Sequence, residues 1–97
     1  LADAGATVLD LHQYGRQLQA RGEKAEALRV FELNAQRFPD AWPVNVGLTR
    51  GYSANGDYKK ALKYARLALA QAPDDLNKNN LKAMIAKLEA GKDANQP

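Results

Sequence analysis

The feature that most constrains this chain is an internal repeat with a period of 34 residues. When residues 11–40 are shifted onto residues 45–74, eight positions are identical, whereas a chain of this biased composition gives about three by chance. A period of this length is typical of helical hairpins that stack into an array. The identical pairs are Arg16/Arg50, Ala20/Ala54, Gly22/Gly56, Ala27/Ala61, Leu28/Leu62, Leu33/Leu67, Pro39/Pro73 and Asp40/Asp74.

Composition agrees with a helical fold. Ala and Leu supply 31 of the 97 residues, while Val, Ile and Thr together supply 7, a balance that favours helices and excludes a β-sandwich or barrel. The length is enough for one domain and too short for two of ordinary size. The chain contains no Cys, which excludes disulfides, thiol catalysis and thiolate metal sites.

Apolar spacing and helix-terminating residues predict five helices. The first covers about residues 8–22, where Thr7 and Asp10 form a capping pair and Gly22 ends the helix. The second ends before Pro39, since proline disfavours a helical conformation in the residue before it. Asp40 is expected to cap the third helix, which has Pro43 in its first turn.

The remaining two helices follow the same signals. The third helix is expected to end at Gly56, and the fourth to run from Tyr58 to just before Pro73. Asp74 or Asp75 is expected to cap a fifth helix that ends at Gly91.

With these positions in view, the chain resembles the tetratricopeptide repeat (TPR) family. The second unit departs from the family pattern at Asn45, Thr49 and Ala65, where larger apolar residues, glycine and an aromatic residue are usual. The resemblance is carried by Leu11, Tyr14, Gly15, Leu18, Gly22, Ala27, Phe31 and Pro39 in the first unit, and by Leu48, Tyr52, Gly56, Asp57, Tyr58, Ala61, Leu62, Ala68 and Pro73 in the second.

The resemblance implies an all-α fold, a short right-handed superhelix of antiparallel helix hairpins. Its expected parts are an N-terminal linker (1–7), two TPR units (8–40 and 41–74), a capping helix (75–91) and a flexible tail (92–97). Gly15, Ala27, Ala61 and Ala68 are expected where helices approach closely. A chain of two units and a cap also suggests part of a longer protein, and a phrase at residues 31–42 resembles repeat tails appended to bacterial proteins.

An inventory of reactive side chains argues against catalysis. The chain has one His, His12, and one Ser, Ser53, and no carboxylate lies at a matching position to orient the His. Both are expected to face solvent on first helices. One His without Cys leaves only carboxylates for zinc, and no phosphate-binding glycine loop precedes Lys-Ser or Lys-Thr. The sequence predicts no enzyme, no metal and no cofactor.

In the TPR family the first helices of the units line a concave groove that binds extended peptides or partner helices. The two arginines lie one period apart, with no acid at the equivalent positions, and could grip a carboxylate through forked hydrogen bonds. The alternative is that both arginines are ordinary solvated residues. The groove residues implied by the resemblance are His12, Arg16, Gln19, Arg50 and Ser53, continued by Asn80, Met84 and Lys87.

Two other features have competing interpretations. Lys59, Lys60, Lys63 and Arg66 form a basic face on the fourth helix, which is either a solvated outer face, the favoured interpretation, or a nucleic-acid surface with tyrosines nearby. Trp42, at the junction between units, is either a packing residue, which is favoured, or an exposed anchor for a partner.

The sequence therefore favours a non-enzymatic module that binds a protein or peptide with an acidic group. The alternative is an intramolecular accessory domain that docks on a neighbouring domain, and nucleic-acid binding ranks below both. No apolar run approaches the roughly 20 residues that cross a bilayer, so membrane insertion is not expected. Localisation and self-association stay open.

Overall fold

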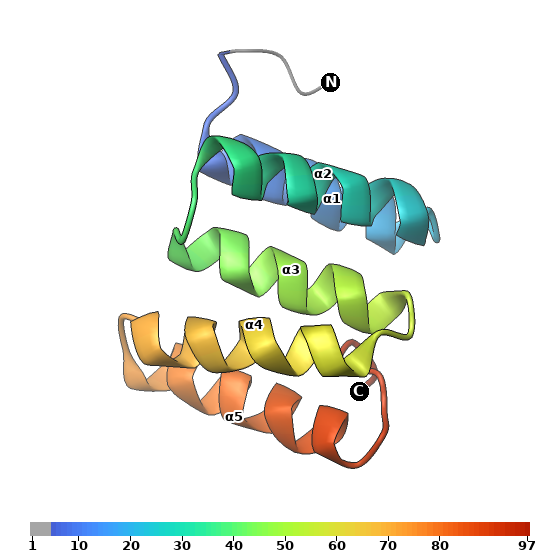
Figure 1. Ribbon diagram of the computed structural model, residues 1–97, viewed down its shortest axis with the longest axis vertical. Coiled ribbons are helices and arrows are strands. Elements are labelled where there is room, and N and C mark those ends of the chain that lie inside the picture. The colour runs from blue at the N-terminus through green and yellow to red at the C-terminus, as the bar shows by residue number, and fades with distance from the viewer. Residues whose placement is uncertain (1–4) are drawn as a thin grey trace.

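The structure of the protein, a computed structural model, describes residues 5–97, so the first four residues of the expected linker lie outside the described part. The described chain is all-α, with five helices and no strand: α1 (Val8–Ala20), α2 (Lys24–Arg37), α3 (Trp42–Ala54), α4 (Tyr58–Gln71) and α5 (Asp75–Glu89) (Figure 1). The predicted helical hairpins are confirmed, and the observed bounds agree with the expected ones to within two or three residues.

Local capping explains why α1 begins and ends where it does. The Thr7 side chain accepts a hydrogen bond from the Asp10 backbone N–H, and the Asp10 carboxylate accepts one from the Thr7 N–H, which completes a capping box. Gly22 follows the helix with φ +83°, a conformation that costs glycine little. The Glu23 N–H then donates to the Leu18 carbonyl, as in a Schellman motif.

The same ending recurs at α3 and α5. Gly56 and Gly91 also have positive φ values, of 84° and 74°. The following residues, Asp57 and Lys92, donate their N–H groups back to the carbonyls of Tyr52 and Lys87. Three helices therefore end with one hydrogen-bonding pattern, which makes these glycines necessary.

Asp40 does not cap α3, and the prediction that it does is wrong. The N-cap is Ala41, and no side chain caps this helix. Asp40 instead has φ +59°, so it turns the chain in the left-handed region, which Asp tolerates better than most residues. Its backbone carbonyl accepts a hydrogen bond from the Gln71 side chain, which ties the α2–α3 turn to the end of α4.

The helices stack in layers along the long axis of the molecule, with α1 and α2 at one end and α5 at the other (Figure 1). Successive helices pack against each other, and α1 also contacts α3. One core cluster centres on α1, α2 and the start of α3, and the other on α4 and α5. The helix α3 joins the two clusters, because it contacts α1, α2 and α4.

The first cluster is organised around the ring of Phe31, which is 1% exposed. A Cβ atom added to Gly15 would lie 2.4 Å from the ring, and one added to Gly47 or Gly51 would lie 2.7 or 2.8 Å from it. These separations are far below van der Waals contact. The α2 ring therefore sits directly on the backbones of α1 and α3, and glycine is required on both.

The small residues of the second unit have the expected role. Ala61, Ala65 and Ala68 of α4 are fully buried, as is Ala27 of α2, which agrees with alanine at close helix contacts. The two polar departures on α3 are also accommodated. Asn45 Nδ2 donates to Gln71 Oε1 at 2.8 Å, and Thr49 Oγ1 donates to the Asn45 carbonyl at 2.8 Å, so these polar groups are paired in the core.

The contact between Gly15 and Phe31 generates a testable prediction. Replacing Gly15 with Ala gains about 1 kcal/mol of helix propensity, but the new methyl group overlaps a ring that already contacts the backbones of α1 and α3 at three glycines. We expect Gly15→Ala to lower the free energy of unfolding by about 1–2 kcal/mol, as overpacking does, measured by urea denaturation.

A double-mutant cycle supplies the control. Phe31→Leu alone is expected to cost about 1–3 kcal/mol by leaving a cavity, whereas in Gly15→Ala/Phe31→Leu the methyl group fills part of that cavity, so the double variant loses less than the sum of the single ones. A Gly15→Ala protein as stable as the parent would contradict the packing described.

Candidate binding groove

A small cavity lies where the ends of α1 and α3 meet, and we call it the α1–α3 pocket. Its volume is about 180 Å³, and it opens to solvent. The contact between α1 and α3 brings Arg16 and Arg50 together at this pocket, as their spacing of one period implied. The pocket is lined by Arg16, Gln19, Ala20, Arg50 and Asn95.

Positive charge is concentrated at the pocket. Arg16 is exposed and Arg50 is half-buried, and burial together with the neighbouring Arg16 charge lowers the pKa of Arg50. Within residues 5–97 the ion pairs are Arg21–Glu23, Arg29–Glu26 and Arg66–Glu89, so neither pocket arginine is neutralised by a carboxylate there. The Nε atom of Arg50 is buried and finds no hydrogen-bond acceptor in the described chain.

This arrangement suits an anion. A guanidinium group offers donors in a planar fork that matches a carboxylate. A negative group in the pocket would lessen the repulsion between the two arginines and could accept hydrogen bonds from them. The pocket volume fits a carboxylate with a short side chain and is too small for a large organic ligand.

Residues 92–97 differ from the flexible tail suggested by the sequence, because they fold back onto α3. Ala94 is 5% exposed, and its backbone N–H donates to Ser53 Oγ at 2.8 Å. The Ser53 hydroxyl in turn donates to Asp93 Oδ1 at 2.6 Å. Ser53 is itself 1% exposed, so the expectation that it faces solvent is wrong.

The Asp93 carboxylate also shapes the segment. It accepts hydrogen bonds from the backbone and side-chain amides of Asn95 at 2.9 and 2.8 Å, which gives a local Asx-type turn. Burial raises the pKa of Asp93, but these bonds, the one from Ser53 and the Lys24 charge outweigh burial and leave the pKa below 3.8. The carboxylate is therefore ionised in the docked segment at neutral pH.

Asn95 links the segment to the pocket. Its Oδ1 accepts a hydrogen bond from Gln19 Nε2 at 2.9 Å and a longer one from Arg50 at 3.4 Å. Its Nδ2 donates to the Arg50 carbonyl at 3.0 Å. The sequence analysis did not predict Asp93 and Asn95 as pocket residues. Their hydrogen-bond partners lie 40 to 76 positions away in the chain, and no periodic pattern links them to these partners. The Asp-x-Asn pattern after Gly91 was the one local signal, because it favours a turn.

His12 lies beside the pocket and is half-buried, so the expectation that it faces solvent is also wrong. Its ring lies 5.9 Å from that of Phe31 between centroids. Burial, with the charges of Arg16 and Arg50, lowers its pKa from 6.5 to about 4, although a hydrogen bond to the Pro43 backbone acts in the opposite direction. The imidazole is therefore neutral at pH 7.

The three groove residues that were expected on α5 lie in three different environments. Lys87 Nζ donates to the Gln96 carbonyl at 2.6 Å, so it holds the docked segment. Met84 is 7% exposed and belongs to the core cluster of α4 and α5. Its expected place in the groove is corrected, because the side chain packs inward. Asn80 is exposed on α5 and is not among the residues that line the pocket.

The Ser53 hydroxyl and the His12 ring do not pair with each other in the described part of the chain. The Ser53 hydroxyl is directed at Asp93 rather than at His12. Among residues 5–97, no three His, Cys, Asp or Glu side chains are grouped so that they could hold a metal ion. Across the same range, no helix combines the length and the apolar character that a membrane span requires.

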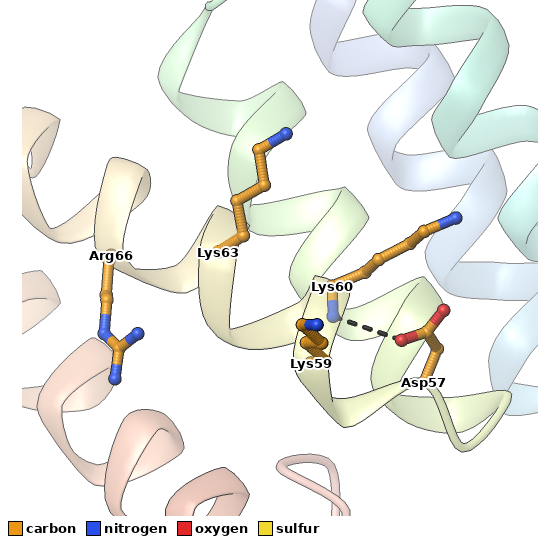
Figure 2. A pocket seen from close by; sticks show the side chains of 5 residues that line it. All are labelled: Asp57, Lys59, Lys60, Lys63 and Arg66. Carbon is orange, nitrogen blue, oxygen red and sulfur yellow. Dashed lines mark hydrogen bonds between the residues drawn. The ribbon is translucent and has the colours of Figure 1, made fainter.

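A second depression, of about 540 Å³, lies on the outer face of α4 and is lined by Asp57, Lys59, Lys60, Lys63 and Arg66. Figure 2 shows that the basic side chains point in different directions instead of toward one point.

Several of these groups already have partners. Lys60 and Lys63 each lie 5.3 Å from the ring centre of a tyrosine, Tyr52 and Tyr64. These two rings stack on each other, with centroids 5.7 Å apart, and so present no free pair of faces to nucleic-acid bases. The face of α4 is therefore the weaker candidate site.

Trp42 is a packing residue, as the favoured interpretation predicted, and not an exposed anchor. The side chain is partly buried at the start of α3, against the core cluster of α4 and α5. Its Nε1 atom is buried. Its rings contribute apolar area to the core cluster of α4 and α5.

The low pKa of His12 generates a prediction about pH. In the unfolded chain the imidazole takes up a proton near pH 6.5, whereas in the folded chain it does so only near pH 4. The unfolded state therefore binds more protons between these values, and stability falls as the pH is lowered from 6.5 to 4. We expect a loss of about 1–2 kcal/mol from this group, after allowance for solvent screening.

His12→Gln, which cannot be protonated, is the matched control. Urea denaturation of both proteins at pH 7, 6, 5 and 4 should give curves whose difference changes over this range. If the two proteins lose stability in parallel, His12 is not the cause.

Comparisons of the chain with protein-family models, with curated proteins and with solved structures find no match. The likeness to TPR proteins therefore rests on the repeat and its residues.

Proposed function

We propose that this protein is a non-enzymatic interaction module of TPR type whose α1–α3 pocket binds an acidic group of a peptide or partner segment. The observation that carries the proposal is the pair Arg16 and Arg50, which converge on one cavity without a carboxylate to neutralise them within the described chain. In most proteins such arginines pair with acids or point to solvent. Here one of them is half-buried.

The chemistry of binding follows from this geometry. A ligand carboxylate would accept hydrogen bonds from the two guanidinium groups, and Gln19 would supply a further polar contact at the rim. Truncating one partner of such a partly desolvated pair costs about 2–5 kcal/mol. Because the contact is electrostatic, binding should weaken as the salt concentration rises.

The second candidate function is an accessory role within a larger protein. The occupation of the α1–α3 region by residues 93–95 favours it, because this surface already accommodates an intramolecular segment. In that function the neighbouring domain would supply the acidic group, and the module would have no free ligand.

Charge reversal tests the proposal. Hexapeptides that carry one Asp, one Glu or no acid are assayed on an array against the full chain and against Arg16→Glu/Arg50→Glu. We expect acidic peptides to bind the parent, and the reversal to weaken this binding by at least tenfold, which is about 1.4 kcal/mol or more.

The variant Lys59→Glu/Lys82→Glu makes the same change in net charge at two exposed residues outside the pocket. It should bind acidic peptides within twofold of the parent. Equal losses in both double variants would show non-specific attraction and contradict the assignment of the pocket. Circular dichroism confirms that each variant is folded.

A further inference from the structure

The segment 93–95 makes contacts of the kind that a bound partner would make. It reaches the pocket from 40 or more residues away in the chain, and its three residues each use a different contact: a carboxylate on Ser53, a buried methyl group, and an amide on Gln19 and Arg50. All three successive residues are therefore engaged with side chains or backbone of α1 and α3.

The amide of Asn95 occupies a position suited to a ligand oxygen. Its Oδ1 atom accepts from Gln19 and, at 3.4 Å, from Arg50. A carboxylate oxygen at this place could accept the same bonds and would add the charge attraction that a neutral amide lacks. The docked segment therefore accepts hydrogen bonds from Gln19 and from one nitrogen of Arg50, and it leaves the charges of Arg16 and Arg50 without a carboxylate.

Asp93 and Ala94, the first two residues of the segment, both contact Ser53. Ser53 acts both as donor, to the Asp93 carboxylate, and as acceptor, from the Ala94 N–H. The first bond needs a side-chain acceptor, and a carboxylate accepts more strongly than a neutral amide. The second bond needs a residue other than proline, and the burial of Ala94, which is 5% exposed, favours a small side chain at its position. Lys87 then holds the chain beyond it through the Gln96 carbonyl.

We propose that the α1–α3 pocket and Ser53 recognise a segment of the form Asp-small-Asx, and that residues 93–95 occupy this site in cis and exclude partners until a matching segment displaces them. The inference rests on the proposed function, since it names the segment that the module would bind. A tethered ligand competes at an effective concentration in the millimolar range, so a free partner must bind tightly or be present in excess.

The test compares three forms of the full chain. In Asp93→Ala/Asn95→Ala the side chains that dock are removed. In Lys92→Ala/Gln96→Ala, the matched control, two exposed side chains of the same segment are removed. The probe is a fluorescent peptide Lys-Asp-Ala-Asn-Gln-Pro with blocked ends, measured by fluorescence anisotropy.

We expect the probe to bind Asp93→Ala/Asn95→Ala at least tenfold more tightly than it binds the parent or the control. A probe in which Asp and Asn are replaced by Ala should bind at least tenfold more weakly, and adding Ser53→Ala should weaken binding of the original probe. Equal binding of the probe to all three forms, or no binding to any, would overturn the inference.

A second measurement needs no variant and so does not depend on whether the variants fold. In nuclear magnetic resonance spectra of the parent chain, an excess of the unlabelled peptide should shift the signals of the Ala94 N–H and the Asn95 side-chain amide toward the values of the free peptide. Unchanged signals at saturating peptide would contradict displacement.

The outcomes also separate this inference from the proposed function. If acidic peptides bind the parent through its arginines while Asp93→Ala/Asn95→Ala gains nothing, the proposed function stands and the cis occupant is excluded. If the probe binds the opened variant equally well when Arg16 and Arg50 are reversed, the cis occupant stands and the role of the arginines is refuted.

Discussion

The contact on which the rest of the structure depends is the seating of the Phe31 ring against the backbones of Gly15, Gly47 and Gly51. The ring comes from α2, while the glycines belong to α1 and α3. It fixes how closely these two helices approach and how they are aligned along their length. Because Arg16 and Arg50 each lie one residue from one of these glycines, the position of the ring also determines where the two guanidinium groups meet.

Much of the fold could be predicted from the sequence, since helix ends are local. Gly22, Gly56 and Gly91 each end a helix, and Thr7 with Asp10 begins one, through contacts between residues at most five positions apart. The error at Asp40 is also local: the residue turns the chain instead of capping it. The roles of Gly47 and Gly51 are different, because they depend on an aromatic ring from another helix.

The sequence predicted the two arginines of the candidate site but not the segment that docks beside them. The 34-residue period placed Arg16 over Arg50, and their shared pocket is a consequence of stacking equivalent helices. Asp93 and Asn95 could not be foreseen, since no periodicity links them to α3, and their docking depends on hydrogen bonds across 40 to 76 positions. The burial of Ser53 and of Met84 likewise follows from packing partners that a helical pattern alone does not specify.

The repeated helix ending has a consequence for how such an array could grow. After Gly22 and Gly56 the chain continues directly into α2 and α4, whereas after Gly91, with the same hydrogen bond at its helix end, it turns toward α3. A helix that began after Lys92 in the manner of α2 would carry Asp93 and Asn95 away from Ser53 and Arg50. Residues 92–97 can therefore either form part of another helix that extends the array or occupy the pocket, but they cannot do both.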